Sequence, residues 1–177
     1  MGELRHFRRG YGGVRLTVSR RILGVDPGSL RTGYGIVDLK GNSVTAVAWG
    51  VVRLDDGASF PDRLFKIHSE LSEIIRLYRP VEAAIEKVFL AKNASSALKL
   101  GQARGAAIVT CRTQGLTVFE YSAKEIKLAA TGYGAAPKEQ VAGMVARLLG
   151  LHGPVPPDAT DALAMAFCRA VTRELPE

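Results

Sequence analysis

The sequence predicts an α/β fold in which α-helices flank a five-stranded mixed β-sheet, and three observations support this prediction. Three apolar runs joined by short turns open the ordered part of the chain, at residues 22–26, 33–39 and 44–53. Apolar residues with helical spacing begin near Phe60. Two further apolar runs, which lie at 81–86 and 116–120, alternate with helical segments. Alternating strands and helices are typical of an α/β domain.

The connections between the predicted strands indicate how they pair. The first three strands form an antiparallel meander, because Pro-Gly-Ser at 27–29 and Lys-Gly-Asn at 40–42 supply short turns. The helix after Phe60 ends at Arg79, because the residue before Pro80 avoids the α region. The strand at 81–86 follows this helix, which favours parallel pairing with an earlier strand.

The second half of the chain is predicted to be mainly helical. A long helix over 93–114 has Asn93 as its N-cap. Small residues recur on or near one face of it, namely Ala94, Ala97, Gly101 and Gly105. This face permits close approach of either the sheet or a second subunit. Further helices are expected from Ser122 to Ala130, over 137–149 with Pro137 in the first turn, and from Asp158 to about 173.

Length and charge indicate one domain preceded by a basic arm. The chain has 177 residues, which is enough for one domain with a substantial core. Residues 1–21 hold six Arg and one acid, so 22–177 carry only +2 of the formal net charge of +7. We therefore predict a flexible arm over 1–21 and a folded domain over 22–177. Charge alone does not establish nucleic-acid binding by this mildly basic domain.

The two cysteines and the hydropathy pattern favour a cytoplasmic protein. Cys111 and Cys168 lie in apolar helical contexts, and two such thiols do not form a disulfide framework. A reducing cytoplasm is the natural inference. No run of about 18 apolar residues occurs, so no membrane partner is expected.

Four acidic residues stand where strands end or a helix begins: Asp26, Glu86, Asp158 and Asp161. Each has an ordinary explanation as well, because Asp is common before Pro-Gly turns and at helix N-caps. Acids at the ends of separate elements can nevertheless converge at one sheet edge, where they repel one another unless cations neutralise them. Oxygen donors without a Cys/His cluster suit Mg²⁺.

Other motifs for cofactors or catalysis are missing from the sequence. The Gly33-Tyr34-Gly35 stretch leads into a strand and not a helix, so it is not a dinucleotide-binding fingerprint. No phosphate-binding GxxxxGK[ST] loop and no GxSxG motif occur. The three histidines, His6, His68 and His152, lack the spacing of zinc ligands.

Four stretches of the chain resemble the RuvC family of Holliday junction resolvases, within the RNase H-like nuclease superfamily. They are ILGVDPGSLRTGYGIVD at 22–38, AAIEKVFLAKNASSALKLGQARGAAI at 83–108, FEYSAKEIK at 119–127 and DATDALAMA at 158–166. The resemblance implies an RNase H-like fold and a homodimer that makes paired symmetric nicks in four-way DNA junctions. It also implies RuvA and RuvB as partners.

The resemblance further implies roles for individual residues. The four acids would be catalytic metal ligands for two Mg²⁺ ions per active site, with Mn²⁺ as a substitute. Phe89 would stack on bases at the junction centre. Lys127 and Lys138 would lie near the scissile phosphate, and Lys92 and Arg104 would contact backbone phosphates. Without the resemblance, these residues would be a core Phe and ordinary surface cations.

Three alternatives remain open from the sequence. The first is an RNase H-like nuclease that acts on RNA–DNA hybrids or pre-rRNA ends. The second is an actin-like kinase or ATPase fold, for which 177 residues are too few. The third is a non-catalytic DNA-binding module in which the acids serve only as turn and cap residues.

Overall fold

The computed structural model describes residues 19–87 and 94–172 of the chain. Its five strands are β1 (Arg20–Asp26), β2 (Arg31–Lys40), β3 (Ser43–Arg53), β4 (Glu82–Glu86) and β5 (Thr117–Tyr121). Its five helices are α1 (Phe60–Tyr78), α2 (Ala94–Thr113), α3 (Ala123–Thr131), α4 (Lys138–Leu148) and α5 (Pro157–Val171). The order of elements is the predicted one, and most boundaries agree within two residues.

The strands form one mixed sheet in the order β3-β2-β1-β4-β5. β1, β2 and β3 are the predicted antiparallel meander, with one irregularity between Ile36 and Val37. β4 pairs with β1 in parallel, and β5 pairs with β4 in parallel. Parallel strands end at the same edge, so the carboxyl ends of β1 and β4 lie side by side. The predicted five-stranded mixed sheet is thereby confirmed.

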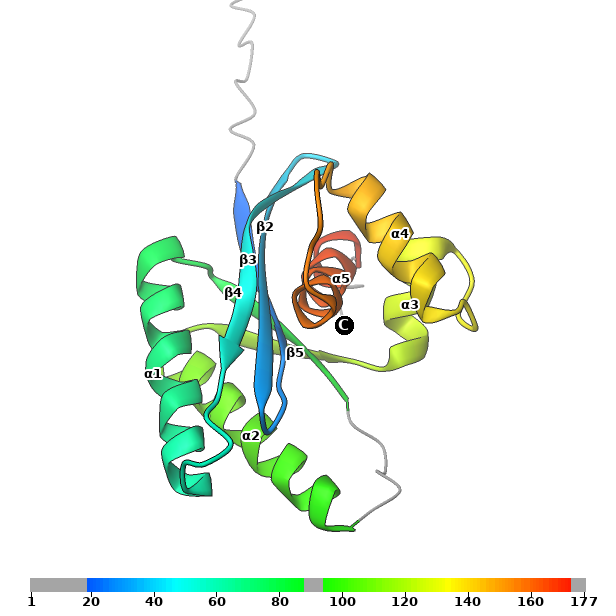
Figure 1. Ribbon diagram of the computed structural model, residues 1–177. Helices are drawn as coiled ribbons and strands as arrows, with labels where there is room; N and C mark the ends of the chain where they lie inside the picture. Colours follow the sequence, from blue (N-terminus) through cyan, green and yellow to red (C-terminus); the bar gives the residue numbers. More distant parts are fainter. Residues whose placement is uncertain (1–18, 88–93, 173–177) are drawn as a thin grey trace, which may run out of the picture.

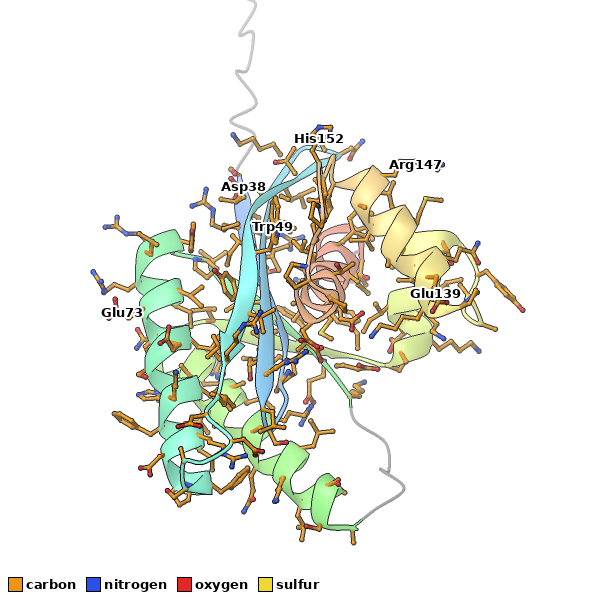
Figure 2. All side chains as sticks on the ribbon, in the orientation of Figure 1. Asp38, Trp49, Glu73, Glu139, Arg147 and His152 are labelled. Atoms are coloured by element: carbon orange, nitrogen blue, oxygen red, sulfur yellow. The ribbon has the colours of Figure 1, made fainter. Side chains whose placement is uncertain are left out.

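Helices cover both faces of the sheet (Figure 1). α1 and α2 lie on one face, and α3, α4 and α5 lie on the other. Two groups of buried residues fill these layers, one around Leu71 and Ile85 on the α1 side and one around Leu163 and Met165 on the α5 side. Side chains occupy the space between sheet and helices (Figure 2). The central strands are therefore buried on both faces, as their apolar sequences indicate.

The first strand begins at Arg20, earlier than the predicted start at Ile22. Arg20 and Arg21 extend the antiparallel ladder opposite Leu39 and Asp38. The Arg21 guanidinium donates two hydrogen bonds to the Asp38 carboxylate, at 2.7 and 2.8 Å, so this arginine is part of the folded sheet. The predicted arm over 1–21 otherwise lies outside the described residues, apart from Ser19. The division into an arm and a domain therefore remains a prediction.

The helix ends show which caps form, including one at Ser59 that was not predicted. Ser59 caps α1, and Ser122 forms a capping box with Glu125 at the start of α3. The proposed N-cap Asn93 lies outside the described residues. Pro137 precedes the first residue of α4 and has no side-chain cap bond, so it lies one position earlier than predicted.

The start of α5 differs from the prediction in a way that bears on function. α5 begins at Pro157 and its N-cap position is Pro156, with no side-chain cap hydrogen bond. Asp158 therefore lies in the first turn and is not the N-cap. The capping explanation for Asp158 is wrong, because Pro156 occupies the N-cap position, but an acid in the first turn still interacts favourably with the helix dipole.

α5 crosses the sheet at very close range. A Cβ placed on Gly24 in β1 would lie 1.8 Å from the backbone oxygen of Ala162, so only glycine permits this approach. The side chains of α5 are buried from Ala162 to Ala170. Both cysteines are free and buried. Within 19–87 and 94–172, no helix is long and apolar enough to cross a membrane.

Candidate active site

Asp26 and Glu86 lie next to each other at the carboxyl edge of the sheet. The parallel register of β1 and β4 pairs Val25 with Ile85, so the residues that follow them, Asp26 and Glu86, end neighbouring strands. Apolar residues precede both acids and are fully buried, whereas the acids are partly exposed. The buried strands therefore carry these two carboxylates to the edge of the core.

The first turn of α5 brings the other two acids to the same edge. Asp26 pairs across the ladder with Gly33 of β2. A Cβ placed on Gly33 would lie 2.0 Å from the backbone oxygen of Asp158, so α5 begins directly against this part of β2. Asp161 follows Asp158 by three residues, a spacing that places both side chains on the same side of the helix. Asp26, Glu86, Asp158 and Asp161 are called the acidic cluster below.

The charges in the acidic cluster act on Asp26 most strongly. Burial, together with the negative charges of Asp161, Asp158 and Glu86 in that order, raises the pKa of Asp26 to about 7. The ammonium group of Lys138 opposes this effect. All four predicted acids are thus close enough to interact electrostatically around one carboxylate, although they come from distant parts of the sequence.

Glu86 has a similar environment with two lysines nearby. Burial raises the pKa of Glu86, and the charge of Asp161 adds to the increase. Lys138 and Lys127 both act in the opposite direction. The structure therefore brings the two predicted lysines together with the acids, one from α3 and one from the start of α4.

A direct ion pair joins α4 to the acidic cluster. The Lys138 Nζ donates a hydrogen bond to Asp161 Oδ2 at 2.6 Å, and this bond raises the pKa of the lysine. Both residues line a cavity of about 250 Å³ together with Glu86 and Lys127. Apolar side chains complete its wall: Ala123, Ile126, Val141, Ala164 and Met165. Carboxylate and ammonium groups therefore line the same cavity.

The donor atoms of the acidic cluster suit a hard divalent cation, because they are carboxylate oxygens that repel one another. As the side chains stand, no group of three or more His, Cys, Asp or Glu residues in the described ranges has the spacing to hold a metal ion. Lys138 already supplies a positive charge to Asp161. A cation that several carboxylates share would therefore require their side chains to rotate toward one another.

The remaining predicted contact residues divide into two groups. Phe89 and Lys92 lie outside the described residues. Arg104 lies on α2, where its Nε donates to the backbone oxygen of Glu86 at 3.0 Å and its guanidinium also bonds the Glu120 carboxylate. Arg104 is thus adjacent to the acidic cluster, but its contacts in the structure are with protein atoms.

One residue that matters to the site was not singled out from the sequence. Gly33 belongs to a stretch that is not a dinucleotide-binding fingerprint, yet its missing side chain allows α5 to begin beside Asp26. A glycine inside a strand pattern is a signal for close backbone approach, and this signal was available. The sequence could not indicate which helix makes the approach.

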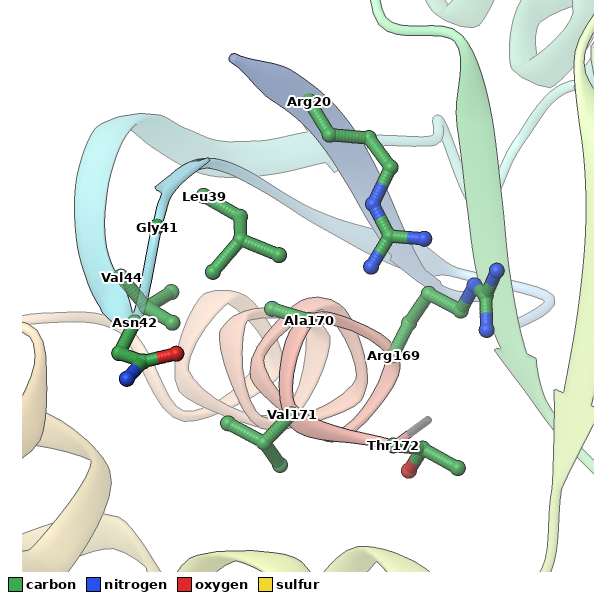
Figure 3. A pocket seen from close by; sticks show the side chains of 9 residues that line it. All are labelled: Arg20, Leu39, Gly41, Asn42, Val44, Arg169, Ala170, Val171 and Thr172. Carbon is green, nitrogen blue, oxygen red and sulfur yellow. The ribbon is translucent and has the colours of Figure 1, made fainter. Parts of the chain in front are cut away.

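A second, larger cavity lies away from the acidic cluster, where β1 begins and α5 ends (Figure 3). Its volume is about 630 Å³, and Arg20 and Arg169 both line it. Both guanidiniums bond the carboxylate of Glu82, and Arg169 also lies 3.6 Å from the ring centroid of Phe119. These contacts tie β1, β4, β5 and α5 together, so the arginines there have a structural explanation.

The fold and the site together define an α/β protein with four acids at one edge of its sheet and a neighbouring cavity lined by two of these acids and two lysines. The family model for "Crossover junction endodeoxyribonuclease RuvC" matches residues 22–169. The protein of that name from Citrifermentans bemidjiense is 54% identical over 149 residues, which are 84% of this chain and 91% of the relative. The one from Saccharophagus degradans is 52% identical over 152 residues, which are 86% and 88% of the two chains.

Solved structures give the same result. RuvC of T. thermophilus in complex with Holliday junction substrate matches with a TM-score of 0.81 and 34% identity, over 85% of this chain and 93% of that one. The yeast mitochondrial resolvase Ydc2 shares the fold, with a TM-score of 0.63 at 13% identity over 85% and 78% of the two chains. The chain belongs to the RuvC family of crossover junction (Holliday junction) endodeoxyribonucleases, and it is an enzyme of that class.

Proposed function

We propose that the acidic cluster is the catalytic metal site of a resolvase that cuts four-way DNA junctions by paired symmetric nicks during recombination and repair. The observation that carries this proposal is the convergence of the four acids, which together with burial raises the pKa of Asp26 to about 7. Turn or cap residues would have no reason to gather at one sheet edge. Their mutual repulsion is a cost that cation binding would offset.

The residues of the site have distinct tasks in this proposal. Mg²⁺, two ions per site with Mn²⁺ as a substitute, would supply the positive charge that activates water and stabilises the leaving oxygen. The acidic cluster would bind and orient this charge at the sheet edge. Lys138 and Lys127 would interact with the phosphate, whose negative charge increases in the transition state. The cavity that both lysines line beside Glu86 and Asp161 supports this assignment.

We also propose that Phe89 and Lys92 contribute to junction binding, whereas Arg104, for which the resemblance implies a phosphate contact, bonds protein acceptors in the structure. Phe89 would stack on unpaired bases, a contact worth about 1–3 kcal/mol per base. Lys92 would contact backbone phosphate. For Arg104, a phosphate contact would have to replace or share the hydrogen bonds that its guanidinium makes with Glu86 and Glu120.

A homodimer would place two active sites on one junction and explain paired nicks. The outer surface of α2 supports this proposal. Leu98 and Val109 are 68% and 59% exposed there, and nothing within 4 Å would meet a Cβ on Gly101 or Gly105. The buried residues of α2 are others, namely Ala103, Ala107, Thr110 and Cys111. The small residues on α2 are therefore better explained by a partner than by the sheet.

RuvA and RuvB complete the proposal as partners that move the junction before it is cut. An arm over residues 1–21 would carry a net charge of +5, which would add a salt-dependent attraction to DNA. Deleting residues 1–18 should leave the folded domain intact, because β1 begins at Arg20. Comparing the junction affinity of the shortened and full chains at several salt concentrations tests whether the arm contributes.

The test of this function is cleavage of a labelled synthetic four-way junction in the presence of Mg²⁺. The wild type is compared with Asp26→Asn, and the substrates include a linear duplex and an RNA–DNA hybrid. We expect paired, symmetric and ligatable nicks in the junction alone. Asp26→Asn should bind the junction and fold but lose cleavage by a factor of about 10³ or more, because the site loses a ligand charge.

Two results would overturn the proposal. Cleavage by Asp26→Asn at the wild-type rate would remove Asp26 from the catalytic site. Cleavage of the hybrid in preference to the junction would instead assign an RNA-processing specificity to the same acids. Binding of the junction without any nicks, across a set of junction sequences, would indicate a non-catalytic module.

A further inference from the structure

Arg104 makes two contacts that link α2 to the ends of two strands. Its Nε donates a hydrogen bond to the backbone oxygen of Glu86, the last residue of β4, at 3.0 Å. Another nitrogen of the guanidinium bonds the Glu120 carboxylate on β5. β4 and β5 are neighbours in parallel pairing, so one side chain holds both strands near their carboxyl ends. A bidentate guanidinium is suited to this because its donors have a fixed geometry.

The position of Arg104 is itself firmly held. Ala103, one residue before it on α2, is fully buried, and so is Ala107, one turn further on. Both pack in the same group of buried residues as Ala83 and Ile85 of β4. The backbone that carries Arg104 therefore cannot move independently of the strand that carries Glu86.

The backbone of Glu86 needs such support because the chain leaves the sheet there. Ladder pairing of β1 with β4 ends at Ile85, one residue earlier. On the β5 side, the amide of Lys87 donates to the Tyr121 oxygen at 2.8 Å. The bond from Arg104 to the Glu86 oxygen is a further restraint on this peptide, and it acts on the residue whose carboxylate belongs to the acidic cluster.

We propose that Arg104 is a positioning residue, which fixes the end of β4 so that the Glu86 carboxylate points toward Asp26 and Asp161. This inference rests on the proposed function, since it presumes that Glu86 belongs to the catalytic site. It differs from a role for Arg104 in phosphate binding, because the guanidinium is directed at protein acceptors. Its side chain is only 21% exposed, which leaves little of it for DNA.

The decisive comparison uses Arg104→Met and a matched variant on the same helix, Arg112→Met. Methionine keeps much of the length and apolar contact of arginine and removes its donors. Arg112 also donates to a backbone oxygen, that of Leu116 at 3.0 Å, but Leu116 precedes β5 at the opposite end from the acidic cluster. Single-turnover cleavage of the four-way junction gives the rate at saturating enzyme, and fluorescence anisotropy in Ca²⁺ gives junction affinity.

A positioning role predicts a loss of rate without a loss of binding. We expect Arg104→Met to cut about 10–100-fold more slowly, because small displacements of a catalytic group have effects of this size. The Mg²⁺ concentration for half-maximal rate should rise several-fold, and junction affinity should stay within about twofold of wild type. Arg104→Lys should recover part of the rate, because an ammonium group can still donate to the Glu86 oxygen. Arg112→Met should match wild type in all these measurements.

Phosphate binding predicts the reverse pattern. Arg104→Met would then weaken junction binding, while the rate at saturating enzyme stayed at the wild-type value. The slope of log affinity against log salt concentration would become shallower by about one, which corresponds to the loss of one phosphate contact. That result would overturn the proposal. So would an unchanged rate together with unchanged affinity.

Glu120→Gln provides a second variant if Arg104→Met does not fold. It retains an acceptor for Arg104 but removes the charge, so a smaller loss of rate, about 2–10-fold, is expected with unchanged affinity; a wild-type rate would overturn the proposal.

Glu86→Gln distinguishes a failure of the proposed function of the acidic cluster from a failure of the positioning role of Arg104. If Glu86→Gln still cuts at the wild-type rate, the proposed function of the acidic cluster fails; if it is inactive while the Arg104 variants are normal, only the positioning role fails.

Discussion

Lys138 Nζ lies 2.6 Å from Asp161 Oδ2, and this ion pair joins the first residue of α4 to the first turns of α5. A lysine at a helix N-terminus is unfavourable because it meets the positive end of the helix dipole. The carboxylates of the acidic cluster offset this cost, since Asp161, Asp26 and Asp158 all raise the pKa of Lys138. The position of Lys138 is therefore explained by the site and not by the helix that carries it.

Replacing Lys138 by glutamine should reduce cleavage far more than stability. The side chain is 64% exposed, so the ion pair should contribute less than about 1 kcal/mol to the free energy of unfolding. Loss of a charge that stabilises the transition state typically lowers the rate by about 10²–10³-fold. Single-turnover cleavage and urea unfolding measure the two effects. Lys66→Gln on α1, across the sheet, should change neither; equal rates for both variants would remove Lys138 from the catalytic site.

The pKa of Asp26 predicts how stability depends on pH in the absence of divalent ions. The pKa rises from 3.8 to about 7 on folding, so between these values the folded carboxyl holds a proton that the unfolded one has released. The free energy of unfolding should therefore fall as pH rises through this window and level off above it. The upper limit of this effect on the free energy of unfolding is about 4 kcal/mol, because the pKa changes by about three units and each unit corresponds to about 1.4 kcal/mol.

Asp26→Asn provides the comparison for this prediction. Asparagine does not ionise, so the variant should lose this part of the pH dependence and should be about 1–4 kcal/mol more stable than wild type at pH 8 in EDTA. Urea unfolding at intervals from pH 4 to pH 8 measures the difference. If the free energies of unfolding of wild type and Asp26→Asn, plotted against pH, ran parallel over the whole range, Asp26 would have an ordinary pKa.

Gly33→Ala should disturb the site through the backbone of α5. The added methyl group would lie 2.0 Å from the Asp158 oxygen, so the start of α5 has to move away from β2. Overpacking of this kind costs about 1–3 kcal/mol, and the shift of Asp158 should lower the cleavage rate as well. Thermal unfolding and junction cleavage test both effects.

Gly143→Ala is the matched control for this glycine. Nothing lies within 4 Å of a Cβ at that position of α4, and alanine favours the helix by about 1 kcal/mol relative to glycine. This variant should be as stable as wild type or more so, with unchanged cleavage. A Gly33→Ala variant that behaves in the same way would contradict the close contact between β2 and α5.

Glu82→Gln should destabilise the fold at the edge opposite the acidic cluster. The Arg169 side chain is only 3% exposed, and its Nε bonds the Glu82 carboxylate at 2.8 Å. Removing one charge of a buried pair commonly costs about 3–5 kcal/mol. Glu73→Gln on the outer face of α1 (Figure 2), where both partners of the pair with Arg76 are exposed, should change the free energy of unfolding very little. Similar urea midpoints for the two variants would contradict this difference.

The sequence by itself determined the order of elements, the antiparallel meander of the first three strands and the ends at which the acids lie, whereas the strand order β3-β2-β1-β4-β5 came from the tertiary structure. Apolar runs and their periodicity are local properties, so β1, β4 and the helix α1 between them could be predicted from single stretches of chain. Pro80 and the capping box of Ser122 likewise act on their immediate neighbours. The positions of Asp26 and Glu86 at strand ends followed directly from these patterns.

Only the tertiary structure decided which charges interact and which faces are covered. Packing between distant segments decided three features of the molecule. These are the place of Asp158 in α5, the neighbours of Gly101 and Gly105 on α2, and the hydrogen-bond partners of Arg104. The same is true of the raised pKa of Asp26, which requires burial and three other acids from two other elements. Electrostatic energy depends on distances in space and on exposure to water, and neither quantity is encoded in a local run of residues.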